Sequence, residues 1–218
     1  MPRYAHIIFD LDGTLIDSAP AILASFQAAF DAAGKTPIRP ITADIIGPPL
    51  TETLQLLSGS DDANTIATLT EHFKAAYDGE GLKQTTAYDG VGDMLASLHA
   101  QGVILHIATN KRLAPTLKIL DMLGWRSYFD SVYALDMVTP RLPNKAAMIA
   151  RLLSDLTIST DTAAYVGDRL EDGESASANA LPFFAATWGY GAISVTQLLP
   201  GWQVFPTPDP ARLAPRDN

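Results

Sequence analysis

The sequence predicts an α/β fold in which a parallel sheet, flanked by helices, is interrupted by a helical insert. A short apolar run near the N-terminus ends abruptly in two carboxylates, which indicates a buried strand that ends at the edge of a sheet. Residues 18–86 show helical periodicity without a convincing strand. From residue 87 onward, apolar runs of strand length alternate with helical segments, and such alternation is typical of βαβ units and a parallel sheet.

The composition is that of a globular protein with one sizeable core, or with a core and a smaller insert. The chain has 218 residues, 47% of them hydrophobic, and a net charge of −9. This acidic balance argues against a nucleic-acid or membrane partner, since nucleic acids and anionic membranes are both bound through a surplus of Lys and Arg. The absence of cysteine excludes disulfides, thiolate zinc sites and a cysteine nucleophile.

The N-terminus is unlike a signal peptide, and no apolar run reaches the roughly 20 residues of a membrane span. A soluble cytoplasmic protein is therefore expected.

The first elements are a strand and a series of helices. The strand covers Ile7, Ile8 and Phe9, and a helix capped by residue 17 or 18 follows it and ends at Gly34. Three further helices are expected in the insert: a short one before the Gly-Pro-Pro corner at 47–49, one from about residue 51, and one from 61 or 62 through 77. The last of these carries Ile66, Leu69, Phe73 and Tyr77.

The remaining elements alternate along the chain. Helices are expected at 91–100, 115–123 and 144–153, and strands at 103–110, 131–134, 163–166 and 183–186. The tail, residues 203–218, is rich in proline and polar residues, so we expect it to be loosely held.

Asp10 and Asp12 follow the first strand directly. Ligands of an open parallel sheet bind outside the carboxyl ends of its strands. Side chains alternate along an extended chain, so the two carboxylates can share one side, where they repel unless a proton or a cation lies between them. A divalent metal would relieve this repulsion. An ordinary acidic turn remains the alternative interpretation of Asp-x-Asp-Gly.

Reactive residues also follow two later strands. Thr109 ends one of them, and Asp168, Glu171 and Asp172 follow another in the segment VGDRLED. These acids could instead favour the start of a helix through its dipole. Together with Asp10 and Asp12, however, they form an oxygen-only ligand set that suits Mg²⁺.

Thr109, Asn110 and Lys145 could contact phosphate oxygens. The first two offer a hydroxyl and an amide after a strand, although the hydroxyl could equally cap the strand end. Lys145 could reach the site from the start of its helix and neutralise a phosphoryl group. A lysine on a helix is more commonly a solvated surface residue.

These segments resemble, in order, the four motifs of the haloacid dehalogenase (HAD) superfamily, and DLDGTLIDS at 10–18 resembles its phosphatase branch. The segments MLGWRSYFDSV and TWGYG are similar to the phosphoglycolate-phosphatase-like subgroup, in which a helical cap follows the first motif. The resemblance implies a Rossmann-like core domain of residues 1–17 and 87–218 and a helical cap of residues 18–86.

The resemblance also implies a Mg²⁺-dependent phosphatase that acts through an aspartyl-phosphate. Asp10 would be the nucleophile and Asp12 the general acid and base. Thr109 and Lys145 would act in catalysis. The phosphate-binding groups would come from four residues: Gly13, Thr109, Asn110 and Lys145. The metal ligands would come from Asp10, Asp12 through its main-chain carbonyl, Asp168 and, in support, Asp172.

The third motif departs from the common Lys-Pro-x-Pro pattern of the superfamily. Here the string is PRLPNK, residues 140–145, with Arg141 near the usual lysine position and Lys145 one helical turn later. We favour Lys145 as the cation of this motif and keep Arg141 as its competitor.

Substrate choice is expected in the cap. The loop that contains Gly47 and Pro49 resembles one that faces the active site in this subgroup, and Thr51 follows at a helix start. A proline-shaped corner without a role in binding is the alternative. The insert has more acids than bases, which disfavours a strongly anionic substrate body.

Several related activities remain open at this point. The expected partner is a small phosphorylated metabolite, with phosphoglycolate-like substrates suggested by analogy, and the expected oligomer is a monomer or homodimer. A sugar phosphomutase or a phosphonate hydrolase using Lys35 could share the same core. A dehalogenase is disfavoured because that branch lacks the second aspartate. A non-catalytic phospho-acceptor module is disfavoured because it needs neither Asp12 nor a cap.

Overall fold

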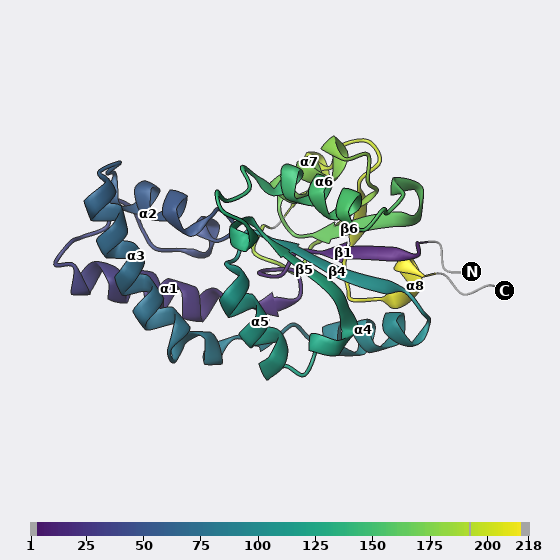
Figure 1. Ribbon diagram of the computed structural model, residues 1–218, viewed down its shortest axis with the longest axis horizontal. Helices are drawn as coiled ribbons and strands as arrows, with labels where there is room; N and C mark the ends of the chain where they lie inside the picture. Colours follow the sequence, from purple (N-terminus) through teal and green to yellow (C-terminus); the bar gives the residue numbers. More distant parts are fainter. Residues whose placement is uncertain (1–3, 192, 215–218) are drawn as a thin grey trace. The chain divides into compact units, whose positions relative to one another are not determined.

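The computed structural model describes residues 4–191 and 193–214. The chain forms two compact units (Figure 1). The first, which we call the core unit, consists of Met1–Ile16 and Ala87–Asn218, and the second, the helical unit, consists of Asp17–Thr86. The insert predicted from the sequence, residues 18–86, starts one residue later than the helical unit. Two-residue strands, β2 (Ile16–Asp17) and β3 (Thr86–Ala87), lie where the chain passes between the units.

The core unit is built on a six-stranded sheet in the order β5-β4-β1-β6-β7-β8, in which each strand runs parallel to its neighbours. β1 lies at the centre, and its last residue, Phe9, pairs with Ile107 of β4 and Val166 of β6. The predicted α/β class with a parallel sheet is therefore confirmed. The strands are β1 (His6–Phe9), β4 (Ile104–Thr109), β5 (Phe129–Ala134), β6 (Ala163–Gly167), β7 (Phe183–Ala186) and β8 (Gln203–Phe205).

Helices cover both faces of this sheet (Figure 1). α6 and α7 lie on one face, and α4 and α5 lie on the other. The helices of the core unit are α4 (Val91–Ala100), α5 (Leu113–Met122), α6 (Lys145–Asp155), α7 (Leu170–Ala178) and α8 (Pro210–Leu213), with short 3-10 helices at Arg126–Tyr128, Leu135–Met137, Thr160–Thr162 and Val195–Gln197. In the part of the chain that the structure describes, no helix is long and apolar enough to span a membrane.

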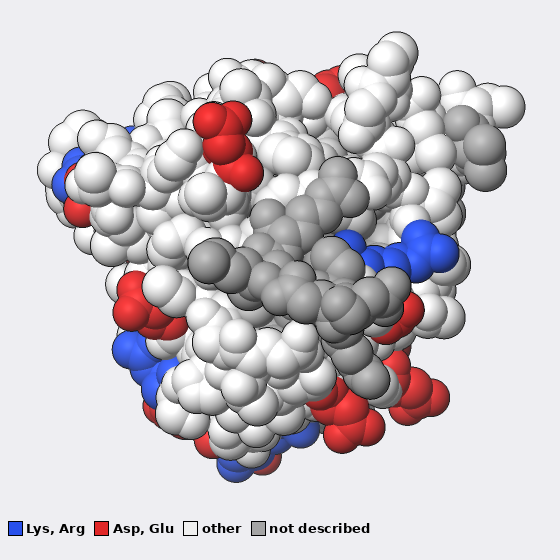
Figure 2. Space-filling view, turned by 90° about the vertical axis from the view of Figure 1, so that its right-hand side faces the viewer, with Lys and Arg blue, Asp and Glu red and all other residues white. Residues whose placement is uncertain are grey.

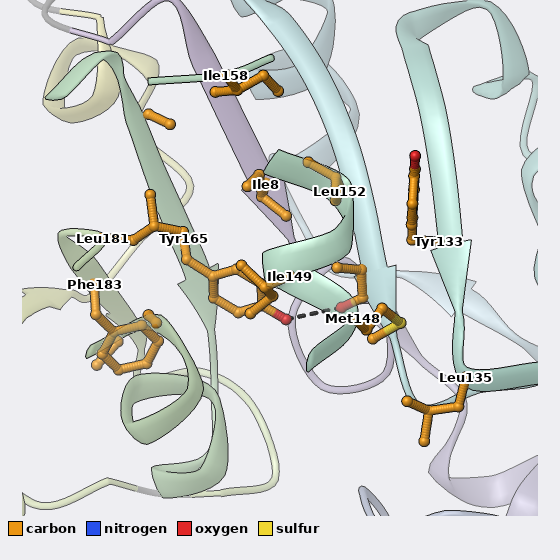
Figure 3. Close-up of a cluster of buried hydrophobic side chains, with 14 of the residues drawn as sticks. Ile8, Tyr133, Leu135, Met148, Ile149, Leu152, Ile158, Tyr165, Leu181 and Phe183 are labelled. Carbon is orange, nitrogen blue, oxygen red and sulfur yellow. Dashed lines mark hydrogen bonds between the residues drawn. The ribbon is translucent and has the colours of Figure 1, made fainter. Parts of the chain in front are cut away.

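A buried apolar cluster fills the space between the sheet and helices α6 and α7 (Figure 3). Ile8, Tyr165 and Phe183 point into it from three strands, and Met148, Ile149 and Leu152 supply the buried face of α6. The Tyr165 hydroxyl donates a hydrogen bond of 2.8 Å to the main-chain oxygen of Ala108, so this polar group is satisfied inside the core. The cluster thus anchors α6, the helix that begins at Lys145, against the sheet.

The helical unit contains the helices that the sequence predicts. Phe26 of α1 lies 4.6 Å from Phe73 of α3, centroid to centroid, and Phe73 stacks on Tyr77 at 5.5 Å. The side chain of Asp62 caps α3 by accepting a hydrogen bond from the Thr65 N–H. The helices are α1 (Ala19–Ala32), α2 (Leu50–Ser58) and α3 (Ala63–Asp78), with 3-10 turns at Ala43–Ile45 and Gly81–Gln84.

The prediction of a loosely held tail is wrong for residues 203–214. β8 adds a sixth strand beside β7, and Phe205 is fully buried against Phe184 and Trp188, with ring centroids 6.0 and 5.4 Å apart. Leu213 of α8 is also fully buried. These few apolar side chains, widely spaced among prolines, hold the segment on the core. Residues 215–218 lie outside the described residues.

Figure 2 shows one face of the molecule, with acidic and basic side chains both scattered over it. Among the described residues drawn in this view, no continuous basic surface is present. This agrees with the net charge of −9.

Candidate active site

Three strands of the core unit end at one edge of the sheet and bring polar groups together. Asp10 follows β1, Thr109 is the last residue of β4, and Asp168 follows β6. β1 pairs with both other strands, so the three residues lie at the shared carboxyl edge. This is the edge at which ligands of parallel sheets bind.

Asp10, Asp168 and Asp172 form a buried carboxylate cluster. Each offers one oxygen, and these oxygens all lie within 4.8 Å of one another. Burial raises the pKa of Asp10 to about 8, with a further contribution from the neighbouring carboxylates and against the opposing charge of Lys145. Burial and the negative charge of Asp172 raise the pKa of Asp168 to about 6, although the hydrogen bond from the Gly191 N–H opposes this rise. These carboxylates therefore resist carrying their full negative charge together.

The cluster fits a divalent cation by its chemistry. Its donors are hard carboxylate oxygens, the kind that Mg²⁺ prefers. Oδ1 of Asp10 is buried, and no described group donates a hydrogen bond to it; Lys145 Nζ lies 3.1 Å away, outside hydrogen-bond geometry. A carboxylate oxygen buried in this way has lost its water and retains coordination capacity.

The main chain fixes Asp168 and Asp172 in place. Asp168 accepts hydrogen bonds from Gly191 N at 2.9 Å and from the Thr14 hydroxyl at 3.3 Å. Asp172, in the first turn of α7, accepts from Arg169 N at 3.0 Å. Gly13 has a φ of +84°, and a Cβ at this position would collide with the carboxylate of Asp168. Glycine is therefore required there by both conformation and space.

Lys145 is the cation that lies in the cluster. Its Nζ is 3.1 Å from Asp10 Oδ1 and 2.5 Å from Asp172 Oδ1, and the side chain is 4% exposed. Burial alone would lower the pKa of Lys145, but these two carboxylates raise it well above its ordinary value. Arg141, the competing cation of the third motif, is exposed. The cap of α6 explains the position, because the Asn144 side chain accepts from Ala147 N and starts the helix at Lys145.

The carboxylate of Asp12 lies outside this cluster and pairs with Lys111. Lys111 Nζ contacts both Asp12 oxygens, at 3.0 and 3.2 Å. The predicted metal ligand of Asp12 is its main-chain carbonyl oxygen and not its carboxylate. The ion pair with Lys111 does not test that contact, which stays a prediction. Lys111 had no role in the sequence analysis, although its place directly after Thr109 and Asn110 is the signal that could have identified it.

Thr109 and Asn110 are placed differently from each other. Thr109 is buried, and its hydroxyl accepts a hydrogen bond from Lys111 N at 3.2 Å. The side-chain amide of Asn110 donates to both carboxylate oxygens of Glu171, at 3.2 and 3.4 Å. The side chain of Asn110 is thus turned to α7, which leaves its main chain as the group for the predicted phosphate contact.

Two residues of the TWGYG segment support the site. Trp188 Nε1 donates to the main-chain oxygen of Thr14 at 3.0 Å, and Gly191 N donates to Asp168. In the sequence, this segment is informative only through its resemblance to a subgroup. Its position directly after β7 was the available signal for a place at the same sheet edge.

The predicted substrate residues belong to the helical unit. Gly47 has a φ of +123°, Pro49 precedes the first residue of α2, and Thr51 is exposed in the first turn of that helix. Their role in substrate choice stays a prediction.

Comparison with known proteins identifies the family. The pattern of the family described as "Haloacid dehalogenase-like hydrolase" matches residues 7–186. The chain belongs to this family. The fold agrees, since a predicted phosphatase from Clostridium acetobutylicum superposes on the HAD-like chain with a TM-score of 0.80 and 27% identity, covering 92% of this chain and 93% of that one.

Two relatives of the HAD-like chain carry different names. A phosphoglycolate phosphatase from Xylella fastidiosa is 33% identical over 192 residues, which is 84% of this chain and 80% of that protein. The tyrosine-protein kinase PtkA from Mycobacterium tuberculosis is 32% identical over 186 residues, which is 85% of this chain. The HAD-like chain spans 62% of the length of PtkA. The family predicted from the sequence is confirmed, and the relatives named phosphatases support the predicted enzyme class.

Proposed function

We propose that the chain is a Mg²⁺-dependent phosphatase that hydrolyses a small phosphate monoester through a phosphorylated Asp10. The observation that carries this proposal is the environment of Asp10. It is a buried carboxylate that follows the central strand and lies beside Asp168, Asp172 and Lys145. A carboxylate held in this way can serve as a nucleophile toward phosphorus.

The reaction that these residues support has two steps. In the first, an oxygen of Asp10 bonds to phosphorus, the bond from phosphorus to the ester oxygen breaks, and Asp12 gives its proton to the departing oxygen. In the second, water attacks the phosphorus of the aspartyl-phosphate, Asp12 takes a proton from the water, and inorganic phosphate leaves. Asp10 and Asp12 are thereby restored.

The phosphoryl oxygens would be held by Thr109, the main chain of Asn110 and Lys145. Lys145 already lies within 3.1 Å of the proposed nucleophile, so its ammonium group is placed beside the incoming negative charge. Fixed donors of this kind stabilise the charge that develops in the transition state.

Mg²⁺ would be held by Asp10, the Asp12 main-chain carbonyl and Asp168, with Asp172 in support. A bound Mg²⁺ supplies positive charge that shields the nucleophile from the phosphoryl oxygens. The raised pKa of Asp10 supports this assignment, because burial disfavours the charged carboxylate even beside Lys145, and a bound metal ion would favour the charged form. A protonated Asp10 is a poor nucleophile.

The proposed substrate is a small phosphorylated metabolite. The name of the Xylella fastidiosa relative supports a phosphoglycolate-like ester as the first candidate. The test is an assay of the purified chain with a panel of small phosphate esters and Mg²⁺, following released phosphate. We expect selective release that is lost in Asp10→Asn, by at least about 10³-fold, while circular dichroism shows an unchanged fold.

Other outcomes would redirect the proposal. Transfer of phosphate from ATP to tyrosine without release would instead support the activity in the name of the PtkA relative. Isomerised sugar phosphate would indicate a mutase, and cleavage of a phosphonate that depends on Lys35 would indicate a phosphonate hydrolase. Stable phosphorylation of Asp10 without turnover would indicate a phospho-acceptor module.

A further inference from the structure

The Lys111–Asp12 ion pair is shielded from water. Lys111 Nζ lies 3.0 Å from Asp12 Oδ1 and 3.2 Å from Oδ2, so one ammonium group contacts both carboxylate oxygens. The side chains are only 6% and 12% exposed. Exposed ion pairs contribute little and hold a side chain loosely, whereas loss of one partner from a buried pair has large effects.

Lys111 lies two residues after the end of β4 and is held there by a hydrogen bond. Its main-chain N–H donates to the buried hydroxyl of Thr109, the last residue of β4. β4 pairs directly with β1, which ends at the residue before Asp10. The lysine and the aspartate are therefore attached to the ends of two adjacent, hydrogen-bonded strands.

The two lysines of the site contact different acids. Lys145 contacts Asp10 and Asp172, and Lys111 contacts Asp12. Asp12 is two residues from Asp10 and repels it as a like charge. The ammonium group of Lys111 places a positive charge against Asp12, and the Asp12 carboxylate lies outside the acidic cluster.

We infer that Lys111 is a positioning residue, which orients the Asp12 carboxylate toward the leaving group of the substrate. The inference rests on the proposed function, in which Asp12 protonates the departing oxygen. Lys111 acts through Asp12 and has no assigned contact with the phosphoryl group. General acid catalysis requires the acid within hydrogen-bond reach of the atom it protonates, so a misdirected Asp12 would slow this step.

The leaving group provides a readout specific to this role. An alkoxide needs a proton as it departs, whereas p-nitrophenolate leaves readily without one. The ratio kcat/KM reports the steps up to departure of the leaving group. Removal of Lys111 should therefore reduce kcat/KM strongly for an alkyl phosphate and weakly for p-nitrophenyl phosphate.

The test compares Lys111→Met and Lys111→Arg with a matched control, Lys118→Met, which alters an exposed lysine of α5. For an alkyl phosphate we expect Lys111→Met to lower kcat/KM by about 100-fold, within the usual contribution of general acid catalysis. For p-nitrophenyl phosphate the expected loss is below about 3-fold, Lys111→Arg should restore most of the alkyl activity, and the control should match the wild type.

A double-mutant cycle adds a second criterion. In the Asp12→Asn background, Lys111→Met should cost little more, below about 3-fold, because both substitutions remove one function. Equal losses for both esters would show a merely structural role and overturn the inference. A loss confined to esters with a second anionic group would also overturn it, since Lys111 would then bind substrate.

A crystal structure of Lys111→Met tests the positioning without turnover. Displacement of the Asp12 carboxylate would support the inference, and an unchanged carboxylate would contradict it. Failure of the wild type to release phosphate from any ester would instead count against the proposed function, and the crystal structures would still decide whether Lys111 orients Asp12.

Discussion

At the scale of single residues, the charges of the site are paired in a definite pattern. Asp168 is held by main-chain and hydroxyl donors, whereas Asp10 and Asp172 share the ammonium group of Lys145. A buried charge is stable only with such partners. We therefore expect the loss of one partner to reduce the stability of the protein.

Lys145→Met should reduce both stability and activity. It leaves Asp10 and Asp172 buried without their cation, which should cost about 3 kcal/mol in the free energy of unfolding. It also removes a proposed phosphate contact, so kcat should fall about 100-fold or more. Urea unfolding and phosphate release measure the two effects.

Arg141→Met is the matched control, because Arg141 is the competing cation of the third motif and is exposed. We expect nearly wild-type activity and stability. A loss in Arg141→Met that matched or exceeded the loss in Lys145→Met would reverse the assignment of this motif.

At the scale of elements, three adjacent strands carry a second cluster of polar side chains, in which His106 is buried and His6 and Ser131 are half-buried. His6 of β1 and His106 of β4 approach to 3.0 Å between Nδ1 and Nε2, and His106 Nδ1 lies 2.8 Å from the Ser131 hydroxyl of β5. Burial lowers the pKa of His106 to about 4. The neighbouring His6 lowers it further, whereas the negative charge of Asp130 opposes the shift. The folded pair thus excludes a proton that the unfolded chain accepts.

The His106 contribution should make stability fall on acidification. The unfolded histidine titrates near its ordinary value of 6.5 and the folded one near 4. Between these values the unfolded state binds more protons, so stability is complete above about pH 6.5 and is lost as the pH falls toward 4. We expect this residue to contribute a loss of about 2 kcal/mol between pH 7.5 and pH 5.

His106→Gln isolates this effect, because other groups of the chain titrate in the same range. Urea unfolding at both pH values should show a smaller loss in His106→Gln than in the wild type. His99→Gln, which alters an exposed histidine, should keep the wild-type loss. An identical loss in all three proteins would exclude His106 as the cause.

The β8 segment makes a second prediction at this scale. Phe205 is fully buried against Phe184 and Trp188, so Phe205→Ala should cost about 3 kcal/mol in the free energy of unfolding. Val204→Ala, at the neighbouring half-buried position, should cost less than about 1 kcal/mol. Equal and small effects in thermal unfolding would show that β8 does not support the core.

At the scale of the whole molecule, the candidate catalytic residues and the residues predicted to select the substrate belong to different units. The charged residues of the candidate site all belong to the core unit, whereas Gly47, Pro49 and Thr51 belong to the helical unit. The carboxylate cluster should also link the stability of the core unit to the metal. A cation that binds the folded site and relieves its repulsion stabilises the fold by mass action.

We therefore expect Mg²⁺ to raise the Tm of the wild type. At a Mg²⁺ concentration of 100 times Kd the gain is about 2.7 kcal/mol. Asp168→Asn should abolish most of this gain, and a chelator should stop phosphate release. A Tm that does not respond to Mg²⁺, together with metal-independent turnover, would exclude the metal site.

The family, the parallel sheet and the residues that meet at its edge could be predicted from the sequence alone. This was possible because the motif residues follow apolar strand segments directly, and parallel strands end at a common edge. The folded structure was needed to show which charges pair: Lys145 with Asp10 and Asp172, and Lys111 with Asp12. It also decided that β8 belongs to the sheet. Such contacts depend on how elements that are distant in the sequence approach one another in space. The local spacing and periodicity of residues do not predict which of these side chains will meet.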